Sequence, residues 1–245
     1  MKGRDNVNIA VIFAGGIGSR MRSKGTPKQF LEVYGKPILI YTLEKFENNE
    51  NVDSIVIACV KEWIDYCWKI VRKFNISKVK SIVAGGENGQ ESIYNGLKAA
   101  KEISQSEKDI VLIHDGVRPL IDDILINDNI KSVKKYGSAI TCVESKETVA
   151  LIDDNSEIKG TTDRAHTRIA RAPQSFYLRD ILDVHNRAIK DGNINSTDSC
   201  TLMSLYKKQL YVVEGKSENI KITTPDDYYI FKAILQAKEN SEIFA

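Results

Sequence analysis

Short apolar runs rich in β-branched residues alternate with longer amphipathic segments along most of this 245-residue chain. This alternation is typical of βα units, in which helices cover both faces of a buried, mainly parallel sheet. The expected strands, in chain order, are Ile9–Phe13, Ser54–Val60, Val79–Val83, Ile110–Ile113 and Ala139–Val143. The pattern therefore predicts an α/β fold with a mainly parallel sheet flanked by helices.

Helices are expected between and after these strands, where apolar residues recur at spacings of three and four. The predicted helices are Tyr41–Phe46, Glu62–Phe74, Glu91–Ile103, Asp122–Tyr136, Leu178–Lys190 and Ser199–Tyr206. Two further strands are expected at Gln209–Val213 and Asn219–Thr223, before a last helix that begins at Pro225. Thr224 can cap that helix, and the two aspartates after Pro225 favour the positive end of its dipole.

The segment from Glu144 to Thr167 departs from this alternation. It contains the β-prone stretch Thr148–Ile152, a turn-like D-D-N-S sequence at residues 153–156, and then a polar run. These features predict an extended hairpin with too little apolar surface to pack by itself. We expect this hairpin to lie on the domain or to reach another subunit, and residues 1–245 to form a single domain.

The formal net charge of the chain is only +2, from 35 basic and 33 acidic residues. A general nucleic-acid or membrane-surface binder would normally carry a basic excess, so any anion site must be local. The four cysteines form no C-x-x-C pair, and neither a secretory leader nor a spanning apolar run is visible. We expect a cytoplasmic protein with reduced thiols and with no nucleic-acid or membrane partner.

A glycine-rich, cationic loop follows the first expected strand and reads A-G-G-I-G-S-R-M-R-S-K-G-T-P-K-Q-F over residues 14–30. Gly15, Gly16 and Gly18 let main-chain N–H groups approach a ligand, and Arg20 and Lys28 add positive charge. This is the chemistry of a polyphosphate-binding loop, although neither P-loop spacing nor a dinucleotide fingerprint is present. The alternative is a tight turn that carries surface cations. The motif P-K-Q-F and the later G-K-P argue against this alternative.

Two further groups of residues follow later strands. The sequence H-D-G-V-R-P at residues 114–119 comes directly after the strand Ile110–Ile113, at the end of a parallel strand where ligands bind in such sheets. Asp115 can hold Mg²⁺ against phosphate oxygens there, or it can cap a turn and pair with Arg118; the sequence favours neither. Lys221, in the strand expected near the C-terminus, is commonly a solvated edge lysine unless the fold brings it beside the other two groups.

Taken in order, these motifs resemble the cytidylyltransferases that join CTP to a polyol phosphate, the family that contains methylerythritol-phosphate and ribitol-5-phosphate cytidylyltransferases. The resemblance runs from about Ile9 to Ile234. The matching pieces are A-G-G-I-G-S-R-M, P-K-Q-F-L, G-K-P-I-L-I-Y-T-L, A-G-G-x5-S-I, H-D-G-V-R-P, D-R-A-H, P-Q-S-F, T-D-S-C and N-I-K-I-T-T-P-D-D. The resemblance implies a Rossmann-like fold with an extended β-arm for dimerisation, in a homodimer whose exchanged arms, residues 144–167, complete the partner's site.

The resemblance also implies the reaction and its residues. A phosphate monoester attacks the α-phosphorus of CTP in line, and Mg²⁺ with three catalytic cations neutralises charge, namely Arg20, Lys28 and Lys221. Asp115 matches the metal-binding aspartate. The positions expected to bind the nucleotide are Ala14, Gly15, Gly16, Gly18, Gly85, Gly86 and Ser92. Those expected to bind the polyol phosphate are Arg118 and, on the arm, Thr148 and Arg164.

Two positions depart from the family pattern. Gly89 stands where relatives usually carry arginine, and Ala172 replaces the threonine of T-P-Q close to the expected substrate pocket. Arg168 and Arg171 are additional cations that can replace lost contacts or admit a more anionic acceptor.

The acceptor remains open between related polyol phosphates. T-D-S-C and D-R-A-H look more like the ribitol-phosphate members, so ribitol 5-phosphate is favoured over 2-C-methyl-D-erythritol 4-phosphate. A nucleotide-binding homologue without turnover is a third possibility, kept open by Gly89 and Ala172. An NAD(P)-dependent oxidoreductase is disfavoured because the fingerprint spacing fails.

Overall fold

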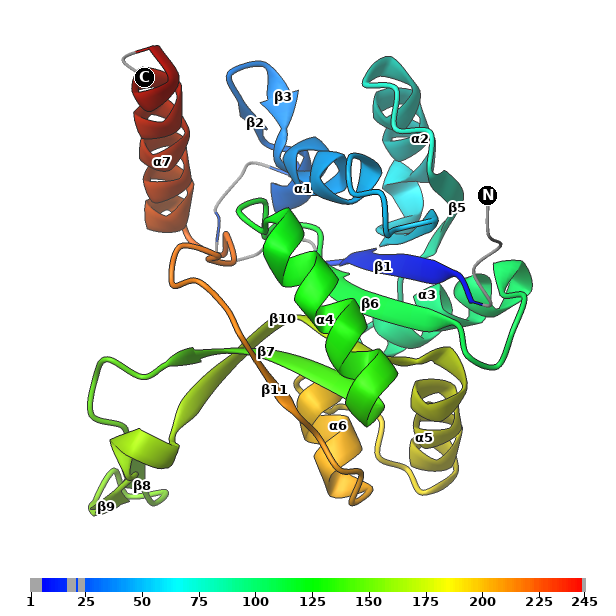
Figure 1. Ribbon diagram of the computed structural model, residues 1–245. Coiled ribbons are helices and arrows are strands. Elements are labelled where there is room, and N and C mark those ends of the chain that lie inside the picture. The colour runs from blue at the N-terminus through cyan, green and yellow to red at the C-terminus, as the bar shows by residue number, and fades with distance from the viewer. Residues whose placement is uncertain (1–5, 17–20, 22–24, 244–245) are drawn as a thin grey trace.

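The computed structural model of the chain describes residues 6–16, 21 and 25–243 (Figure 1). Its centre is a seven-stranded sheet with the order β11-β7-β10-β6-β1-β4-β5. The strands are β1 (Asn8–Ala14), β4 (Ser54–Cys59), β5 (Val79–Ala84), β6 (Ile110–Asp115), β7 (Ser138–Glu144), β10 (Arg168–Tyr177) and β11 (Val212–Glu214). Strands β5, β4, β1 and β6 are parallel, as are β7 and β11, while β10 runs antiparallel to β6 and β7. The predicted α/β fold with a mainly parallel sheet is confirmed.

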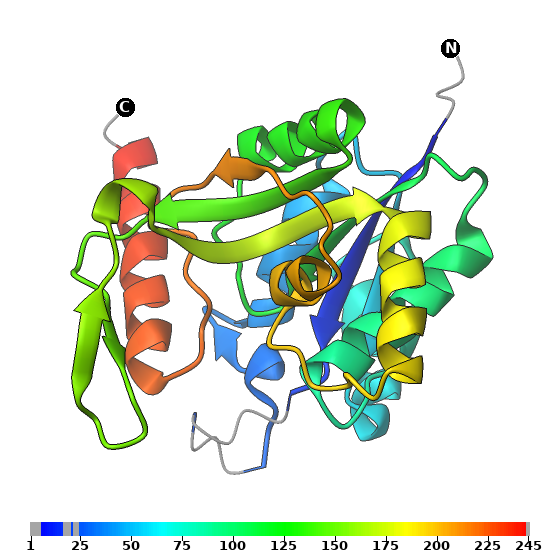
Figure 2. The ribbon, with the colours of Figure 1, turned by 90° about the horizontal axis from the view of Figure 1, so that it is seen from below.

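Helices cover both faces of this sheet (Figure 2). They are α1 (Ile38–Glu47), α2 (Ile64–Lys73), α3 (Gly89–Ile103), α4 (Asp123–Tyr136), α5 (Leu178–Lys190), α6 (Ser199–Leu205) and α7 (Pro225–Ile243). Successive residues of β1 point to opposite faces, so that Ala10 and Ile12 pack with α1, α2 and α4, whereas Ile9 and Val11 pack with α3, α5 and α6. The sheet is therefore buried on both faces, as its continuous apolar strands predict.

Helix α7 lies at one end of the molecule and packs separately (Figure 1). Its Phe231 is fully buried in a small cluster with Ile38 and Ile222. The predicted cap is present, because Thr224 Oγ1 accepts a hydrogen bond from the Asp227 N–H at 3.4 Å. In return, the Asp227 carboxylate accepts hydrogen bonds from the N–H groups of Thr223 and Thr224 at 2.9 and 2.8 Å. This capping anchors the segment that precedes α7, which contributes to the candidate site below.

The predicted arm is a two-stranded antiparallel hairpin, β8 (Ala150–Ile152) and β9 (Ile158–Thr161), that projects beyond the sheet (Figures 1 and 2). Its turn forms because the Asp153 carboxylate accepts hydrogen bonds from the N–H groups of Asn155 and Glu157. The larger apolar side chains of the hairpin are exposed, namely Leu151, Ile152 and Ile158. The prediction that this hairpin cannot bury its own apolar surface is thus confirmed.

The sequence predictions differ from the structure at several places. The strand expected at Gln209–Val213 is β11, which begins only at Val212. Strand β6 extends beyond Ile113 to Asp115, because the polar but buried His114 and Asp115 pair in register with Ile12 and Phe13 of β1. Strand β10 was not expected, since its arginines and proline interrupt the apolar pattern. The strand predicted at Asn219–Thr223 is wrong, because this segment belongs to none of the described ladders. Its Ile222 N–H donates to the Val117 carbonyl at 2.9 Å, and its Asn219 carbonyl accepts hydrogen bonds from arginine side chains.

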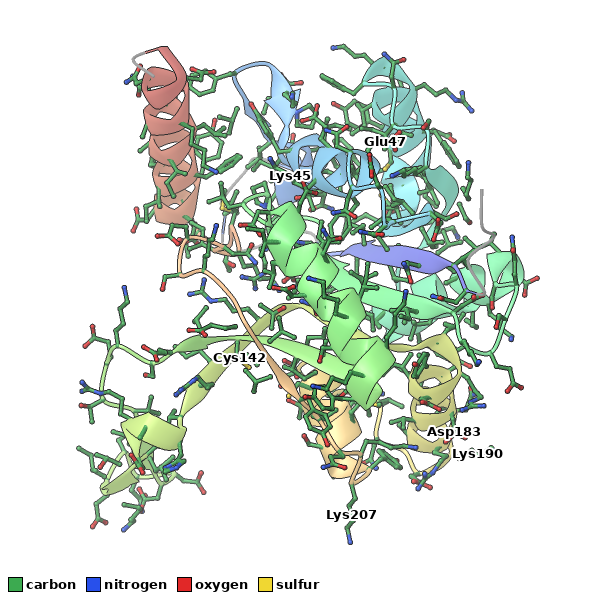
Figure 3. The ribbon with its side chains drawn as sticks, viewed as in Figure 1. Lys45, Glu47, Cys142, Asp183, Lys190 and Lys207 are labelled. Atoms are coloured by element: carbon green, nitrogen blue, oxygen red, sulfur yellow. The ribbon has the colours of Figure 1, made fainter. Side chains whose placement is uncertain are left out.

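The cysteines are structural. All four are described and free; Cys142 sits on β7 within the sheet, where burial raises the pKa of its thiol to about 11 (Figure 3). Such a thiol stays protonated near neutral pH and fills space as a small apolar group. Within the described residues, no helix is both long enough and apolar enough to cross a membrane.

Candidate active site

The site forms where β1 and β6 end side by side. Phe13 and Asp115 are register partners in the parallel pair, so the glycine loop after β1 and the turn after β6 emerge at the same edge of the sheet. A cavity of about 350 Å³ opens at this edge. The predicted site residues that line it are Ala14, Gly15, Gly16, Lys28, Gly86, Ser92, Asp115 and Lys221. Gly18 and Arg20, also predicted, lie outside the described residues.

Two glycines bring the loop after β1 against the loop after β5. A Cβ atom added to Gly85 would lie 3.2 Å from the Cα of Gly15, and one added to Gly15 would lie 2.7 Å from Ser92 Oγ. Ser92 Oγ accepts a hydrogen bond from Gly86 N–H at 2.9 Å and so holds this second loop in place. A side chain at Gly15 would displace Ser92 Oγ and one at Gly85 would crowd the Gly15 backbone, whereas a Cβ at Gly89 would meet no atom within 4 Å.

Lys28 is presented by a short, anchored 3₁₀-helix, Lys28–Phe30. The buried Gln29 donates a 2.6 Å hydrogen bond from Nε2 to the Ala14 carbonyl at the end of β1. Phe30 is buried and stacks on Trp63, with ring centroids 5.0 Å apart. The structure explains the motif P-K-Q-F. Gln29 and Phe30 fix the backbone, and Lys28 lines the cavity.

Asp115 is buried between two cations. Its Oδ2 accepts a hydrogen bond from Arg118 Nε at 3.1 Å, and its Oδ1 lies 2.7 Å from Lys221 Nζ. Burial alone would raise the pKa of Asp115, but the charges of Lys221 and Arg118 lower this pKa well below its usual range, so that the carboxylate stays ionised. Asp115 therefore pairs with Arg118, as one of the two interpretations expected, and it also lines the cavity.

The neighbouring His114 is neutral. Burial lowers its pKa to about 4, and its Nε2 contacts the Arg118 carbonyl at 3.0 Å. The ring thereby ties together the two ends of the turn that carries Asp115 and Arg118. A neutral, fully buried imidazole in this place orients the turn and adds no charge to the site.

Lys221 reaches this cluster because residues 217–223 run beside the turn after β6. Its ammonium group is partly exposed, lies over the Phe13 ring at 5.6 Å and pairs with Asp115. Lys221 is thus not a solvated edge lysine. The fold brings it beside the glycine loop after β1 and the turn that carries Asp115.

A second cavity of about 260 Å³ adjoins the first. The residues common to both cavities are Phe13, Gly89, Asp115 and Lys221. The second cavity is also lined by Arg118, Arg171, Ala172, Gln174, Thr197 and Asp198, of which only Arg118 was predicted as a site residue. Gln174 donates from Nε2 to Asp198 Oδ2 at 2.8 Å, which fixes one wall. The sequence signals for this wall were the motifs P-Q-S-F and T-D-S-C, Ala172 close to the expected substrate pocket, and the additional cation Arg171.

Two carboxylates line the larger cavity, those of Asp115 and Glu87. Asp115 Oδ1 is buried and faces Lys221 Nζ at 2.7 Å. Nowhere in the described parts of the chain do three His, Cys, Asp or Glu side chains converge as metal ligands. This donor set suits Mg²⁺, which keeps several waters and needs only one or two carboxylates together with phosphate oxygens.

Thr148 and Arg164 lie on the arm and line neither cavity of their own chain. Both are exposed, and Arg164 Nη2 donates to Thr148 Oγ1 at 3.3 Å. The structure therefore brings these two residues together, but it does not bring them to the site formed by the same chain.

Comparisons with known proteins agree with this geometry. The family model described as "IspD: 2-C-methyl-D-erythritol 4-phosphate cytidylyltransferase" matches residues 8–237. A ribitol-5-phosphate cytidylyltransferase of Streptococcus agalactiae is 56% identical over 238 residues, which cover 97% of this chain and 99% of that protein. A 2-C-methyl-D-erythritol 4-phosphate cytidylyltransferase of Clostridium acetobutylicum is 40% identical over 236 residues, covering 96% and 99%.

A solved structure has the same fold. The 4-diphosphocytidyl-2C-methyl-D-erythritol synthase of Anaerococcus prevotii superposes with a TM-score of 0.81 at 29% identity, over 94% of this chain and 96% of that one. The sheet, the flanking helices and nearly the whole sequence thus point to one assignment. The chain belongs to the IspD family of cytidylyltransferases.

Proposed function

We propose that this protein transfers CMP from CTP to D-ribitol 5-phosphate, giving CDP-ribitol and pyrophosphate. The observation that carries the choice of acceptor is the difference in similarity, 56% identity to a ribitol-5-phosphate enzyme against 40% to a methylerythritol-phosphate enzyme. The observation that supports the reaction is that two cavities meet at the Asp115–Lys221 ion pair. One cavity suits a nucleotide and the other suits a small phosphorylated acceptor.

The larger cavity takes CTP in this proposal. Main-chain N–H groups of the loop after β1 bind the triphosphate, with Arg20 and Lys28 as its cations. The backbone around Gly85 and Gly86, held by Ser92, binds the cytosine base. The close approach of Gly15 to Gly85 joins the phosphate-binding and base-binding loops into one surface.

The acceptor phosphate attacks at the junction of the cavities. A phosphate monoester is already ionised near neutral pH, so no general base is required. Lys28 and Lys221 neutralise the charge that develops on the α-phosphate, and Arg118 holds Asp115 in place through their 3.1 Å contact. Asp115 is the residue that would hold Mg²⁺, which when bound would neutralise phosphate charge and favour departure of pyrophosphate.

The arm belongs to the proposal as a link between two subunits. Thr148 and Arg164 would bind the acceptor phosphate in the partner's site, in a homodimer with exchanged arms. The exposed Leu151, Ile152 and Ile158 on the arm support this, because a second chain would bury them. We expect the mass in solution, measured by light scattering at micromolar concentration, to be twice that of the chain. A monomer that turns over at full rate would contradict the arm exchange.

The choice of acceptor is tested by measuring pyrophosphate release with CTP and a panel of acceptors. The panel contains the phosphates of ribitol, methylerythritol, xylitol and glycerol. We expect D-ribitol 5-phosphate to give the highest kcat/KM, by about tenfold or more, the size of effect that one missing polar contact or misplaced methyl group produces.

Other results of the panel point elsewhere. A preference for 2-C-methyl-D-erythritol 4-phosphate would favour the second candidate function, which the description of the matched family model supports. Binding of CTP with no release from any acceptor would indicate a nucleotide-binding homologue without turnover.

A further inference from the structure

Arg171 meets Arg118 at a single carbonyl group in the second cavity. Arg171 Nη1 donates to the Ser217 carbonyl at 2.7 Å and to the Asn219 carbonyl at 3.0 Å. Arg118 Nη1 donates to the same Asn219 carbonyl at 2.7 Å. The segment 217–219 therefore holds two guanidinium groups next to each other in the cavity wall.

The charges of this pair are unequally compensated. Arg118 pairs with Asp115, but within the described residues no carboxylate lies at ion-pair distance from Arg171. Burial lowers the pKa of Arg171, the nearby charge of Arg118 lowers it further, and Glu218 opposes both effects. Two adjacent cations with one anion favour a ligand that accepts hydrogen bonds.

Arg171 also retains donors for such a ligand. Both of its hydrogen bonds to described residues use Nη1, which leaves the Nε and Nη2 groups of the planar fork. The strand around it departs from regular pairing: between Ala170 and Gln174 the register of β10 against β7 shifts, so Arg171 and Ala172 leave the ladder and line the cavity. Ala172 is small and places no hydroxyl group there.

The position of Arg171 along the site decides which part of a ligand it faces. Asp115 and Lys221 line both cavities, whereas Arg171 lines only the second. The acceptor phosphate must reach the junction in order to attack the nucleotide. Arg171 consequently faces the part of the acceptor that lies away from its phosphate.

We propose that Arg171 selects the acceptor by donating hydrogen bonds to hydroxyl groups remote from the acceptor phosphate, thereby favouring a long, hydroxyl-rich chain. This inference rests on the proposed function, because it assumes that the second cavity holds the acceptor. A planar guanidinium can bridge two neighbouring hydroxyl oxygens, which a shorter or branched acceptor does not offer at the same place.

The test is steady-state kinetics of Arg171→Met with D-ribitol 5-phosphate and with 2-C-methyl-D-erythritol 4-phosphate. We expect the KM for ribitol 5-phosphate to rise about 10–100-fold, the range for loss of hydrogen bonds from a charged donor. The KM for CTP should stay within about threefold, and the efficiency with the methylerythritol acceptor should change far less. Arg171→Lys, which keeps the charge but not the fork, should be intermediate.

Arg179→Met is the matched control, because Arg179 is an exposed arginine that pairs with Glu107 and Asp180 and lines neither cavity. It should leave all constants unchanged. Equal losses with every acceptor, or a parallel rise in the KM for CTP, would show that Arg171 only supports the turn, and would overturn the inference. So would an unchanged KM for ribitol 5-phosphate. Failure of the proposed function is distinguishable, since the wild-type protein would then release no pyrophosphate with ribitol 5-phosphate.

Discussion

Replacing Lys28 with alanine is expected to lower kcat by about 10²–10³-fold at saturating CTP and Mg²⁺, while the affinity for CTP falls much less. The loss is expected in turnover because, in the proposed reaction, the ammonium group acts on charge that appears as the α-phosphorus is attacked. The short helix that carries Lys28 is anchored independently by Gln29 and Phe30. The substitution should therefore remove the charge and leave the loop in place.

Lys36→Ala is a suitable control for this variant. Lys36 lies a short distance along the chain, pairs with Glu44 at 2.8 Å, and lines neither cavity. The Lys36→Ala variant loses the same charge as Lys28→Ala. Its turnover should stay within about threefold of the wild type, because a partly exposed ion pair contributes little. Near-full turnover of Lys28→Ala under saturating conditions would show that Lys28 has no part in the chemical step.

The Asp115→Asn variant is expected to lose about 10²–10³-fold in turnover and to require more Mg²⁺. Asparagine has nearly the same shape and can still accept the hydrogen bond from Arg118 Nε. It removes the negative charge, however, and leaves Arg118 and Lys221 unbalanced beside the reacting phosphates. A Mg²⁺ titration of activity should show a higher midpoint and a maximum that stays below that of the wild type.

Asp122→Asn provides the control. Asp122 Oδ1 caps α4 by accepting from Leu125 N–H at 2.9 Å, a role that asparagine also fills. Its loss of the exposed ion pair with Lys216 should leave the Mg²⁺ dependence unchanged. Asp115→Asn could instead keep the Mg²⁺ requirement of the wild type and a turnover within about tenfold of it. That result would show that Asp115 takes no part in the reaction.

The Asp115→Asn variant should also change how the stability of the fold depends on pH in acid. Because the pKa of Asp115 is lower in the folded protein than in the unfolded chain, its carboxylate stabilises the fold above the unfolded pKa near 4. That contribution is lost as pH falls below about 4 towards the folded pKa. Asp115→Asn should therefore show a shallower fall in unfolding free energy over this acid range, measured by urea denaturation.

The parallel half of the fold was predictable because it depends on local patterns. Buried parallel strands read as nearly continuous apolar runs, as in Ile9–Phe13 of β1 and residues 55–59 of β4. Strand β10 escaped prediction because Arg168 and Arg171 break this pattern. Its first three residues are exposed, and Arg171 lies where the register shifts.

The segment Asn219–Thr223 shows the opposite failure. Its alternation of polar and apolar residues predicts a strand, and Ile222 is indeed buried. The Asn219 carbonyl, however, accepts hydrogen bonds from Arg118 and Arg171, where a strand would use it in a ladder. Hydrogen bonds to side chains from distant parts of the chain override the local pattern.

The chemistry of the site was visible in the sequence, but its assembly was not. The glycine loop and the cationic Lys28 indicate phosphate binding through their residue types and their place after a strand. For Asp115, the sequence left a metal site and a turn cap equally open. The ordered motifs also indicate the family, which the comparisons confirm.

The tertiary structure alone decided which of these groups meet. Local periodicity records which residues are buried, but it does not record which strand ends are neighbours. The order β6-β1-β4 places Asp115 beside the glycine loop, and the path of residues 217–223 along the turn after β6 brings Lys221 within 2.7 Å of Asp115. That same path sets Arg171 against Arg118, because one carbonyl group, that of Asn219, accepts hydrogen bonds from both.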